Sequence, residues 1–422
     1  MSRSALSPNA IKRGRSPVNR KLFLYVNAFS HLGTMMDMIV VNSMIYVLTD
    51  GSTMWLSACL GIRVLGGMLS SLYSGVLADR FDRKKLMLFA DFARAALILG
   101  MIVFPNPTMI LIISFLIGFL ASFFQVSFNA EVPQIFGEDK VLEVNALIMR
   151  LSSIAMVIGF FSSGLVTERF GFSTVLAIDA LSFALSGVAL MLMKWERTPV
   201  KRQEANVQAK GKLASIFEDL GEVKRYLMLK PLLLTVFGVY LVQTAGASGH
   251  NVGIPLLAAA LDPAAQAKIY GFIWGTWGIG SVVASFLIAR RNVVQKHLNG
   301  FYYGSTVVAG LGFITFLSSE NPWLIFPVVF LVGVSEAVCG TTFSVLMQQC
   351  DNHVRGRVFG VSALLNRFGF ASGFLLVPLL MDILTMPQTI MVCQGAVITA
   401  VIWAVWKSSS HKLKKQPKQT AA

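Results

Sequence analysis

Three acidic residues of this sequence stand inside long apolar stretches, where a carboxyl group could bind and release a proton. They are Asp37, Asp179 and Glu336. A charged side chain at the centre of a bilayer costs about 2.5–3.5 kcal/mol on insertion scales, so each carboxyl group kept there needs an explanation. Apolar surroundings favour the protonated form of a carboxyl group, and proton-coupled transport requires that property. Asp37 and Glu336 are therefore candidates for proton coupling or substrate binding, whereas Asp179 is more readily explained as a structural residue.

Two further ionisable side chains accompany these acids. Arg63 falls at a similar depth to Asp37 when residues are counted along their stretches, so a structural ion pair is the alternative role for Asp37. His250 could bind substrate or relay a proton, and its alternative role is that of a hydrogen-bonded packing residue. The sequence shows no cluster of metal ligands and no nucleophile–base pair. We therefore expect no metal site, no cofactor and no enzymatic activity.

The composition indicates which kind of protein holds these residues. The 422 residues are 55% hydrophobic and only 14% charged, with a mean hydropathy of +0.66. In soluble domains roughly a quarter of the residues are charged, and a helix needs about 20 apolar residues to cross a bilayer. We predict an all-α membrane protein with twelve spanning helices, at residues 22–48, 55–78, 86–104, 109–130, 145–166, 174–193, 231–257, 269–289, 298–317, 322–347, 358–381 and 388–406.

The distribution of the net charge of +15 predicts an orientation. With both termini on one side, 30 of the 36 Lys and Arg residues lie on that side, and only Arg169 and Lys268 lie on the other. Positively charged loops stay in the cytoplasm, so we expect a multi-pass protein of the cell membrane with both termini cytoplasmic. The basic tails are expected to lie on anionic lipid headgroups. Nucleic acid is not an expected partner, because no aromatic residues interleave the basic ones.

The chain also repeats itself. FLIGFLASFFQVSFNAEVPQ from Phe115 resembles FLVGVSEAVCGTTFSVLMQQ from Phe330, which begins 215 residues later. NALIMRL from Asn145 resembles SALLNRF from Ser362 at nearly the same offset. Internal repeats of this kind are typical of secondary transporters, whose substrates bind between the repeats. We predict two related six-helix bundles at 22–193 and 231–406, a linker at 194–230, and tails at 1–21 and 407–422.

A short polar loop, GVLADRFDRKK, joins the second and third predicted spans. Its glycine, its Asp-Arg pair and its further basic residues are Gly75, Asp79, Arg80, Arg83, Lys84 and Lys85. This pattern resembles the signature loop of the major facilitator superfamily of transporters, and the resemblance extends over nearly the whole chain. It implies the major facilitator fold of two pseudo-symmetric six-helix bundles. Asp82 replaces a glycine of the family's turn, and we expect it to adopt the left-handed conformation that Asp tolerates.

The same resemblance implies a cytoplasmic gate. Asp79 would dock near the start of the eleventh span, around residues 355–358, and Arg83 would pair with an acid such as Asp91. Asp91 and Arg94 are three residues apart and therefore share a helix face. The gate residues Gly75, Asp79, Arg80, Arg83, Asp91 and Arg94 would together latch the cytoplasmic side while the carrier faces outward.

Within that superfamily the chain looks most similar to drug and metabolite exporters of the macrolide-efflux type. The motifs behind this resemblance are ADFARA at Ala90–Ala95 and AIDALSF at Ala177–Phe183. Many antiporters carry Gly-Pro-x-x-Gly-Gly on the fifth span. This chain reads GFFSSG at Gly159–Gly164, with Phe160 in place of the proline.

The energy source follows from a missing motif and from simple magnitudes. The sequence has no GxxxxGK[ST] phosphate loop, so we expect an ion gradient rather than ATP to drive transport. One proton moving through 100 mV releases about 2.3 kcal/mol, and a tenfold concentration gradient costs about 1.4 kcal/mol. We expect a monomeric, proton-coupled exporter of an amphipathic drug, siderophore or other secreted metabolite, working by alternating access. A lysolipid flippase, a solute importer and a non-transporting membrane sensor or scaffold remain as alternatives.

Overall fold

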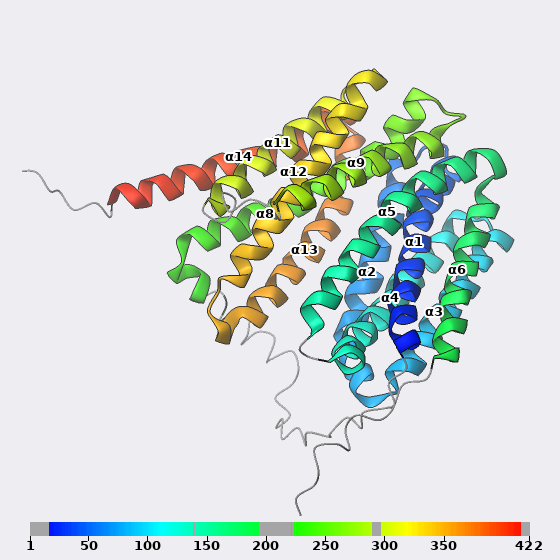
Figure 1. Ribbon diagram of the computed structural model, residues 1–422. Coiled ribbons are helices and arrows are strands. Elements are labelled where there is room, and N and C mark those ends of the chain that lie inside the picture. Colours follow the sequence, from blue (N-terminus) through cyan, green and yellow to red (C-terminus); the bar gives the residue numbers. More distant parts are fainter. Residues whose placement is uncertain are drawn as a thin grey trace, which may run out of the picture.

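The computed structural model consists of long α-helices over the residues that it describes, which are 17–137, 140–193, 221, 223, 225–288 and 297–414. Twelve helices in this part of the chain are long and apolar enough to cross a membrane, as the sequence predicts. In Figure 1 they are α1 (Pro17–Leu48), α2 (Thr53–Arg80), α3 (Arg83–Val103), α4 (Pro107–Phe136), α5 (Val141–Phe170), α6 (Phe172–Leu192), α8 (Pro231–Leu261), α9 (Gln266–Ile288), α11 (Leu298–Leu317), α12 (Pro322–Gln348), α13 (Asn352–Met381) and α14 (Met386–Lys414).

Several helices run further than the apolar stretches that predicted them. α4 continues to Phe136, six residues beyond its predicted end, and α13 begins at Asn352, six residues before its predicted start. The added turns contain charged residues such as Glu131 and Arg355. An apolar stretch records the thickness of the bilayer core, whereas a helix continues until a cap or a turn ends its hydrogen bonding.

Two helices at equivalent places in the repeat begin in the same way. The side chain of Asn106 accepts a hydrogen bond from the Thr108 amide at 2.9 Å, and Pro107 opens α4. Asn321 accepts from the Trp323 amide at 3.0 Å, and Pro322 opens α12. Asn is a strong N-cap and Pro is favoured at the first helical position. The Asn-Pro start is thus a local device shared by the two halves of the chain.

The duplication is also visible where helices cross. α2 crosses α4 in the first bundle as α9 crosses α12 in the second, with glycines at the contact points. A Cβ atom added to any of four glycines would lie 2.1–2.2 Å from a main-chain carbonyl oxygen of the partner helix. The pairs are Gly66 with Phe115, Gly118 with Arg63, Gly280 with Phe330, and Gly333 with Trp277. Arg63 and Trp277 therefore occupy equivalent positions in the two bundles.

The two ends of the molecule pack differently. We name them the linker end, where Met193 caps the C-terminus of α6 before the linker, and the far end opposite. At the linker end each bundle has its own apolar cluster, one around Phe128 and the other around Phe343. At the far end the clusters combine both bundles: Phe374 of α13 packs within the first bundle's cluster, and Phe160 of α5 within the second's. Accordingly, the ribbons in Figure 1 meet where α5 passes α9 and diverge toward the linker end.

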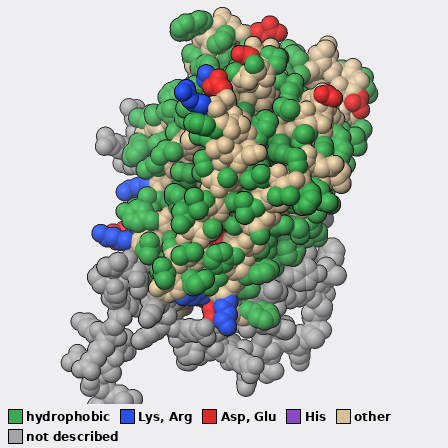
Figure 2. Space-filling model, turned by 90° about the vertical axis from the view of Figure 1, so that its right-hand side faces the viewer, with side chains coloured by type: hydrophobic (Ala, Val, Ile, Leu, Met, Phe, Trp, Pro, Cys, Tyr) green, Lys and Arg blue, Asp and Glu red, His purple; other side chains and the backbone are tan. Residues whose placement is uncertain are grey.

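The surface matches a lipid environment. On the face shown in Figure 2, hydrophobic side chains cover most of the area, and charged ones gather toward its two ends. Large apolar side chains such as Phe286, Leu375 and Trp403 are more than half exposed. Helices with apolar residues all round are stable when lipid surrounds them. The described chain is thus built as a multi-pass membrane protein.

Candidate functional site

A cavity of about 210 Å³ lies between the two bundles, lined by α1, α2, α8 and α13. Its polar lining residues are Thr34, Asn42, Arg63 and Asn251, and the rest of the lining is formed by Met, Val, Leu, Phe and Cys side chains. Pockets for drug-sized ligands measure about 300–1,000 Å³, so this cavity suits one part of such a ligand. Both bundles contribute to its wall, as a site for alternating access requires.

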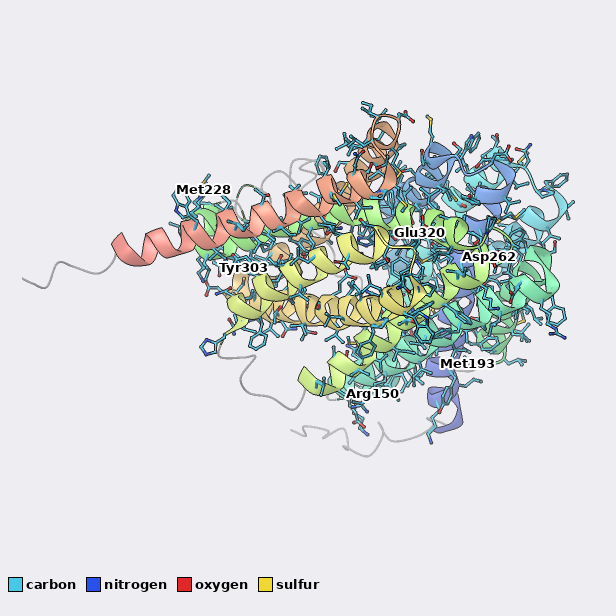
Figure 3. The ribbon with its side chains drawn as sticks, turned by 90° about the horizontal axis from the view of Figure 1, so that it is seen from above. Arg150, Met193, Met228, Asp262, Tyr303 and Glu320 are labelled. Carbon is cyan, nitrogen blue, oxygen red and sulfur yellow. The ribbon has the colours of Figure 1, made fainter. Side chains whose placement is uncertain are left out.

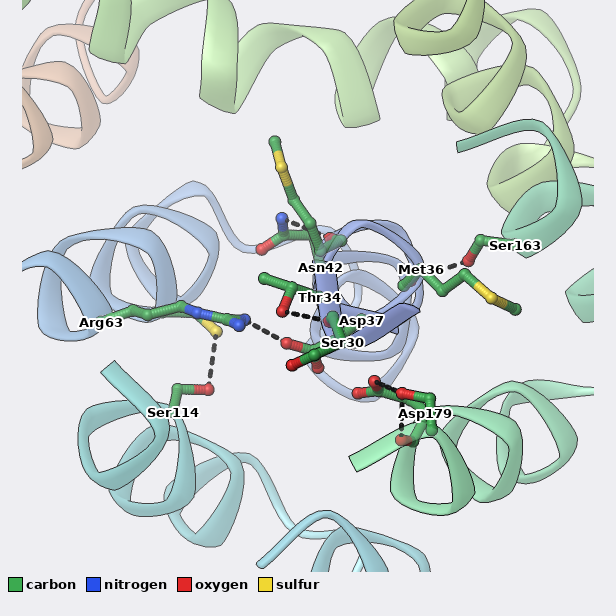
Figure 4. Close-up of polar contacts among 12 residues, drawn as sticks. Ser30, Thr34, Met36, Asp37, Asn42, Arg63, Ser114, Ser163 and Asp179 are labelled. Atoms are coloured by element: carbon green, nitrogen blue, oxygen red, sulfur yellow. Dashed lines mark hydrogen bonds and ion pairs between the residues drawn. The ribbon is translucent and has the colours of Figure 1, made fainter. Parts of the chain in front are cut away.

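Arg63 and Asp37 form the ion pair that their depth predicts. Arg63 Nη1 of α2 lies 2.5 Å from Asp37 Oδ2 of α1, as Figure 4 shows. The Asp37 side chain is 1% exposed, whereas that of Arg63 is 25% exposed and reaches the cavity wall. Asp37 therefore neutralises a cation that faces the cavity, and is itself shielded from the cavity by that cation. This geometry favours the structural role for Asp37.

Asp179 lies on the other side of α1, on α6 (Figure 4). It is fully buried, and its Oδ1 is 3.5 Å from the Ser182 hydroxyl, while Oδ2 has no hydrogen-bond partner in the described part of the chain. A Cβ atom added to Gly33 of α1 would lie 2.3 Å from Asp179 Oδ1. Only glycine lets the carboxyl group approach α1 so closely, and Asp179 is packed inside the first bundle, away from the lining of the cavity.

Asp91 and Arg94 also lie inside the first bundle, and their role in a cytoplasmic gate stays a prediction. Asp91 binds Arg94 on its own helix, and the Ser186 hydroxyl donates to Asp91 Oδ2 at 2.5 Å. The Arg94 guanidinium lies over the rings of Phe124 and Phe183, at 5.0 and 4.2 Å from their centroids. Cation–π contacts and a paired carboxylate are what a buried arginine needs. This cluster joins α3 to α4 and α6.

The expected pair of Arg83 with Asp91 is wrong. Arg83 Nη1 instead lies 3.5 Å from Glu131 Oε1 of α4, while Asp91, a residue described with its partners, bonds Arg94 and Ser186. Arg83 begins α3 at the linker end, whereas Asp91 lies two turns deeper and faces the bundle interior. The spacing of three residues predicted that Asp91 and Arg94 share a face of their helix. It did not predict that this face points into the bundle.

The signature loop is described only in part. Gly75 lies in α2, but the side chains of Asp79 and Arg80 lie outside the described residues, so the docking of Asp79 near residues 355–358 stays a prediction. Asp82 does not adopt the left-handed conformation that we expected. Its φ is −64° and ψ is 113°, and its side chain accepts from the Lys84 amide at 3.0 Å. Asp82 is the N-cap of α3, a role in which Asp needs no unusual φ.

Glu336 has a different environment from the other candidate acids. Its Oε2 accepts a hydrogen bond of 2.7 Å from the indole Nε1 of Trp277, and the residue is half-buried. In the described part of the chain no Lys, Arg or His lies within ion-pair distance of Glu336. Trp277 packs edge-on against Trp274, whose ring lies 5.8 Å from that of Phe160 on α5. Glu336 is thus a carboxyl group without a cation, linked through two indoles to the interface between the bundles.

The repeat relates the two carboxyl sites. Arg63 and Trp277 occupy equivalent positions at equivalent helix crossings, and each holds an acid of its own bundle. Arg63 holds Asp37 as a cation, whereas Trp277 can hold Glu336 only by a neutral hydrogen bond. The first site therefore pairs its acid with a cation, and the second has no cation partner among the described residues.

His250 is a packing residue in this structure. Its ring stacks on Phe313 with centroids 3.7 Å apart and planes 3° apart, and Gln394 Nε2 lies 3.3 Å from its Nδ1. The side chain is 4% exposed and contacts α11 and α14, within the second bundle. The neighbouring Asn251, rather than His250, reaches the cavity.

Further contacts join the bundles beside the cavity. At the far end α5 packs on α9: a Cβ atom added to Gly271 would lie 2.5 Å from the Phe160 carbonyl oxygen, and Glu168 Oε1 lies 3.0 Å from Lys268 Nζ. Nearer the middle, Arg367 Nη1 of α13 donates to the Gly67 carbonyl at 3.0 Å on α2. Arg150, its counterpart in the repeat, is exposed on α5; Figure 3 labels it in a view from the far end. The structure is therefore closed at the far end.

Asn42, Thr34 and the bond between Trp277 and Glu336 are functional features that the sequence did not predict. Asn and Thr are common on helix surfaces, so their types carry little signal. The internal repeat could have pointed to Trp277. It lies 214 positions after Arg63, which is within one residue of the repeat offset of 215. An acid-binding residue at one of these positions points to the other.

Comparison with known proteins agrees with this architecture. Residues 23–374 match the family model described as Major Facilitator Superfamily. An uncharacterized MFS-type transporter of Bacillus subtilis, YfiS, is 24% identical over 335 residues, which is 77% of each chain. A putative bacilysin exporter of the same organism, BacE, is 28% identical over 152 residues, or 35% of this chain and 37% of the relative.

Solved structures show the same fold. The nucleoside transporter NupG superposes with a TM-score of 0.74 at 13% identity, covering 92% of this chain and 98% of its own. A POT family transporter bound to a conjugated peptide superposes with a TM-score of 0.70 at 12% identity, covering 92% and 96%. At such low identity these likenesses concern the fold alone. Family and fold indicate a transporter of small molecules rather than an enzyme, and the chain belongs to the Major Facilitator Superfamily of transporters.

Proposed function

We propose that this protein is a proton-coupled exporter of an amphipathic small molecule, with Glu336 as the coupling carboxyl group. The observation that carries the proposal is the environment of Glu336, which has one neutral hydrogen bond and no cation in the described structure. A carboxylate without a cation is costly in a membrane, so Glu336 gains by binding a proton or a cationic group of the substrate. Competition between these two is a mechanism for antiport.

Asp37 is a weaker candidate for the same role. Arg63 forms an ion pair with the Asp37 carboxylate. If Asp37 bound a proton and released Arg63, the guanidinium would be left as an unpaired cation at the cavity wall, which is unfavourable. The two bundles thus differ in their ionisable groups. The first holds an ion pair that is neutral overall, and the second holds an acid that is able to change its charge. Both walls of the cavity come from one chain, so we propose that the monomer is the working unit.

Export is supported by the relatives and by charge. BacE carries the description of a putative exporter, and its alignment covers about a third of each chain. Most basic residues lie on the linker side of the chain. Positively charged segments stay in the cytoplasm, so this count favours an orientation in the cell membrane with the linker end in the cytoplasm. The structure is closed at the far end, so in this orientation it faces the cytoplasm, from which an exporter takes its cargo.

Orientation has a direct test. Phe81 is 61% exposed in the turn between α2 and α3 at the linker end, and Ser318 is exposed at the far end of α11. We expect Ser318→Cys to react with a membrane-impermeant maleimide in intact cells and Phe81→Cys to react only after permeabilisation. Wild-type protein gives the background from its own cysteines. The reverse labelling pattern would contradict the proposed orientation and with it the direction of transport.

Glu336→Gln tests the coupling. Glutamine keeps the size of the side chain and can still accept from Trp277, but it cannot exchange a proton. Cargo is first identified by mass spectrometry, as compounds that leave cells only when the protein is present. In vesicles we expect Glu336→Gln to exchange that cargo down its gradient but to lose accumulation against it at least tenfold. Glu320→Gln, which changes an exposed acid in the turn after α11, should accumulate cargo normally. Accumulation by Glu336→Gln at the wild-type level would contradict the assignment.

A further inference from the structure

The cavity presents hydrogen-bond donors that nothing in the described chain uses. Arg63 gives Nη1 to Asp37, while its Nε and Nη2 have no partner among the described residues and are not buried. These two nitrogens form one edge of the planar guanidinium, with parallel N–H bonds. Since Arg63 lines the cavity, this edge is available to a ligand.

The cavity also presents acceptors, one from each bundle. Asn42 Nδ2 donates to the Met38 carbonyl at 2.8 Å and to the Tyr270 hydroxyl at 3.2 Å, and Asn251 Nδ2 donates to the Ala247 carbonyl at 2.8 Å. These bonds fix both side-chain amides with Oδ1 left over. Neither Oδ1 has a partner in the described structure, and neither is sealed from solvent. Asn42 on α1 and Asn251 on α8 thus offer fixed acceptors beside the donors of Arg63.

Charge decides what kind of group fits between them. Asp37 already balances the charge of Arg63, so a ligand carboxylate on the free edge would be repelled by Asp37 and would leave the site with an excess negative charge, which is costly in a membrane. A neutral carbonyl suffers no such repulsion and still accepts from Arg63. A neutral N–H group can donate to either Asn. One functional group combines both, and that group is an amide.

We propose that this cavity binds an uncharged amide group of an amphipathic substrate, with the amide carbonyl on Arg63 and the amide N–H on Asn251 or Asn42. The rest of the lining consists of Met, Leu, Val, Phe and Cys side chains. These side chains can pack against an apolar group attached to the amide. Because α1, α2 and α8 would hold one ligand, its binding would bridge the two bundles. The inference rests on the proposed function only in taking this ligand to be the cargo.

Two small probes separate the amide from an anion. 4-Methylpentanamide and 4-methylpentanoic acid share one apolar chain, and the second carries a carboxylate in place of the amide. The full chain is purified in detergent, and its thermal unfolding midpoint is followed against the concentration of each probe, which yields a Kd. We expect the amide to bind about three- to tenfold more tightly than the acid.

Two variants place the binding in the cavity. Arg63→Lys keeps a cation for Asp37 but loses the planar edge, and Asn251→Ala removes an acceptor from a half-buried position. Each should weaken amide binding about three- to tenfold, as expected for one hydrogen bond. Asn129→Ala is the matched control, since Asn129 is exposed on α4 and bonds Gln125. Its affinity for the amide should equal that of the wild type.

Several results would overturn the inference. They are acid binding as tight as amide binding, full affinity in both cavity variants, and no stabilisation by either probe. The assay uses no gradient, so its outcome is separate from that of the proposed function. Glu336→Gln should bind the amide normally. Amide binding without any driven transport would refute the export proposal alone, and driven transport without amide binding would refute this inference alone.

Discussion

Replacing Gly271 by leucine is expected to prevent closure of the far end and to abolish transport. A Cβ atom at Gly271 would lie 2.5 Å from the Phe160 carbonyl oxygen and 3.1 Å from Gly164 Cα, and neither main-chain atom can rotate away. Overpacking costs about 1–3 kcal/mol, which corresponds to a shift of about 5- to 150-fold in the equilibrium between two states. The clash exists only where α5 meets α9, so each bundle should still fold.

The measurement is crosslinking across this contact. Glu168 and Lys268 form an ion pair of 3.0 Å over the same helices, so cysteines at both positions should join through a short bifunctional thiol reagent. Addition of Gly271→Leu should lower the crosslinked fraction at least fivefold. Gly238→Leu is the control, since a Cβ atom there would meet no neighbouring helix within 4 Å. Unchanged crosslinking together with normal transport in Gly271→Leu would show that this packing does not close the carrier.

Asp37→Asn is expected to destabilise the protein rather than simply to uncouple it. The change leaves Arg63 without its carboxylate, and breaking a buried ion pair by removing one partner costs about 3–5 kcal/mol. Arg63 is 25% exposed, which places the expected loss toward the lower end of that range. A lower thermal unfolding midpoint in detergent and a lower yield of folded protein should follow.

Two companion variants sharpen the test of Asp37. The double variant Asp37→Asn/Arg63→Gln leaves no unpaired charge and should recover much of the stability. Glu168→Gln breaks the ion pair of Glu168 with Lys268, and both of these side chains are 36% exposed. This change should lower the free energy of unfolding by no more than about 1 kcal/mol. A stable Asp37→Asn protein that fails only in concentrating cargo would assign the coupling to Asp37 and contradict its structural role.

The sequence predicted the helices and one charge pair because both depend on depth in the membrane. Twelve apolar stretches of bilayer length became twelve helices, and Arg63 met Asp37 at the depth they share. The failed pair of Arg83 with Asp91 has a different cause. Direction around the helix axis decides which neighbours a side chain meets, and Asp91 faces inward, where Arg94 reaches it.

The environment of Glu336 could not be predicted in the same way. Tryptophans in apolar spans usually pack or face lipid, so nothing in its type marks Trp277 as the partner of an acid. The sequence did show Glu336 as a membrane carboxyl group. The partner of Glu336 becomes visible only where α9 crosses α12. There Trp277 contacts Glu336, and no cation does so in the described part of the chain.

The central claim is that cargo leaves as protons enter, and that Glu336 carries the exchange. The most direct measurement follows the internal pH of proteoliposomes with an enclosed pH dye while the identified cargo is added outside. Cargo moving inward should drive protons outward, so we expect a rise of the internal pH with wild-type protein and none with Glu336→Gln. A fall of the internal pH, or an equal rise with Glu336→Gln, would contradict it.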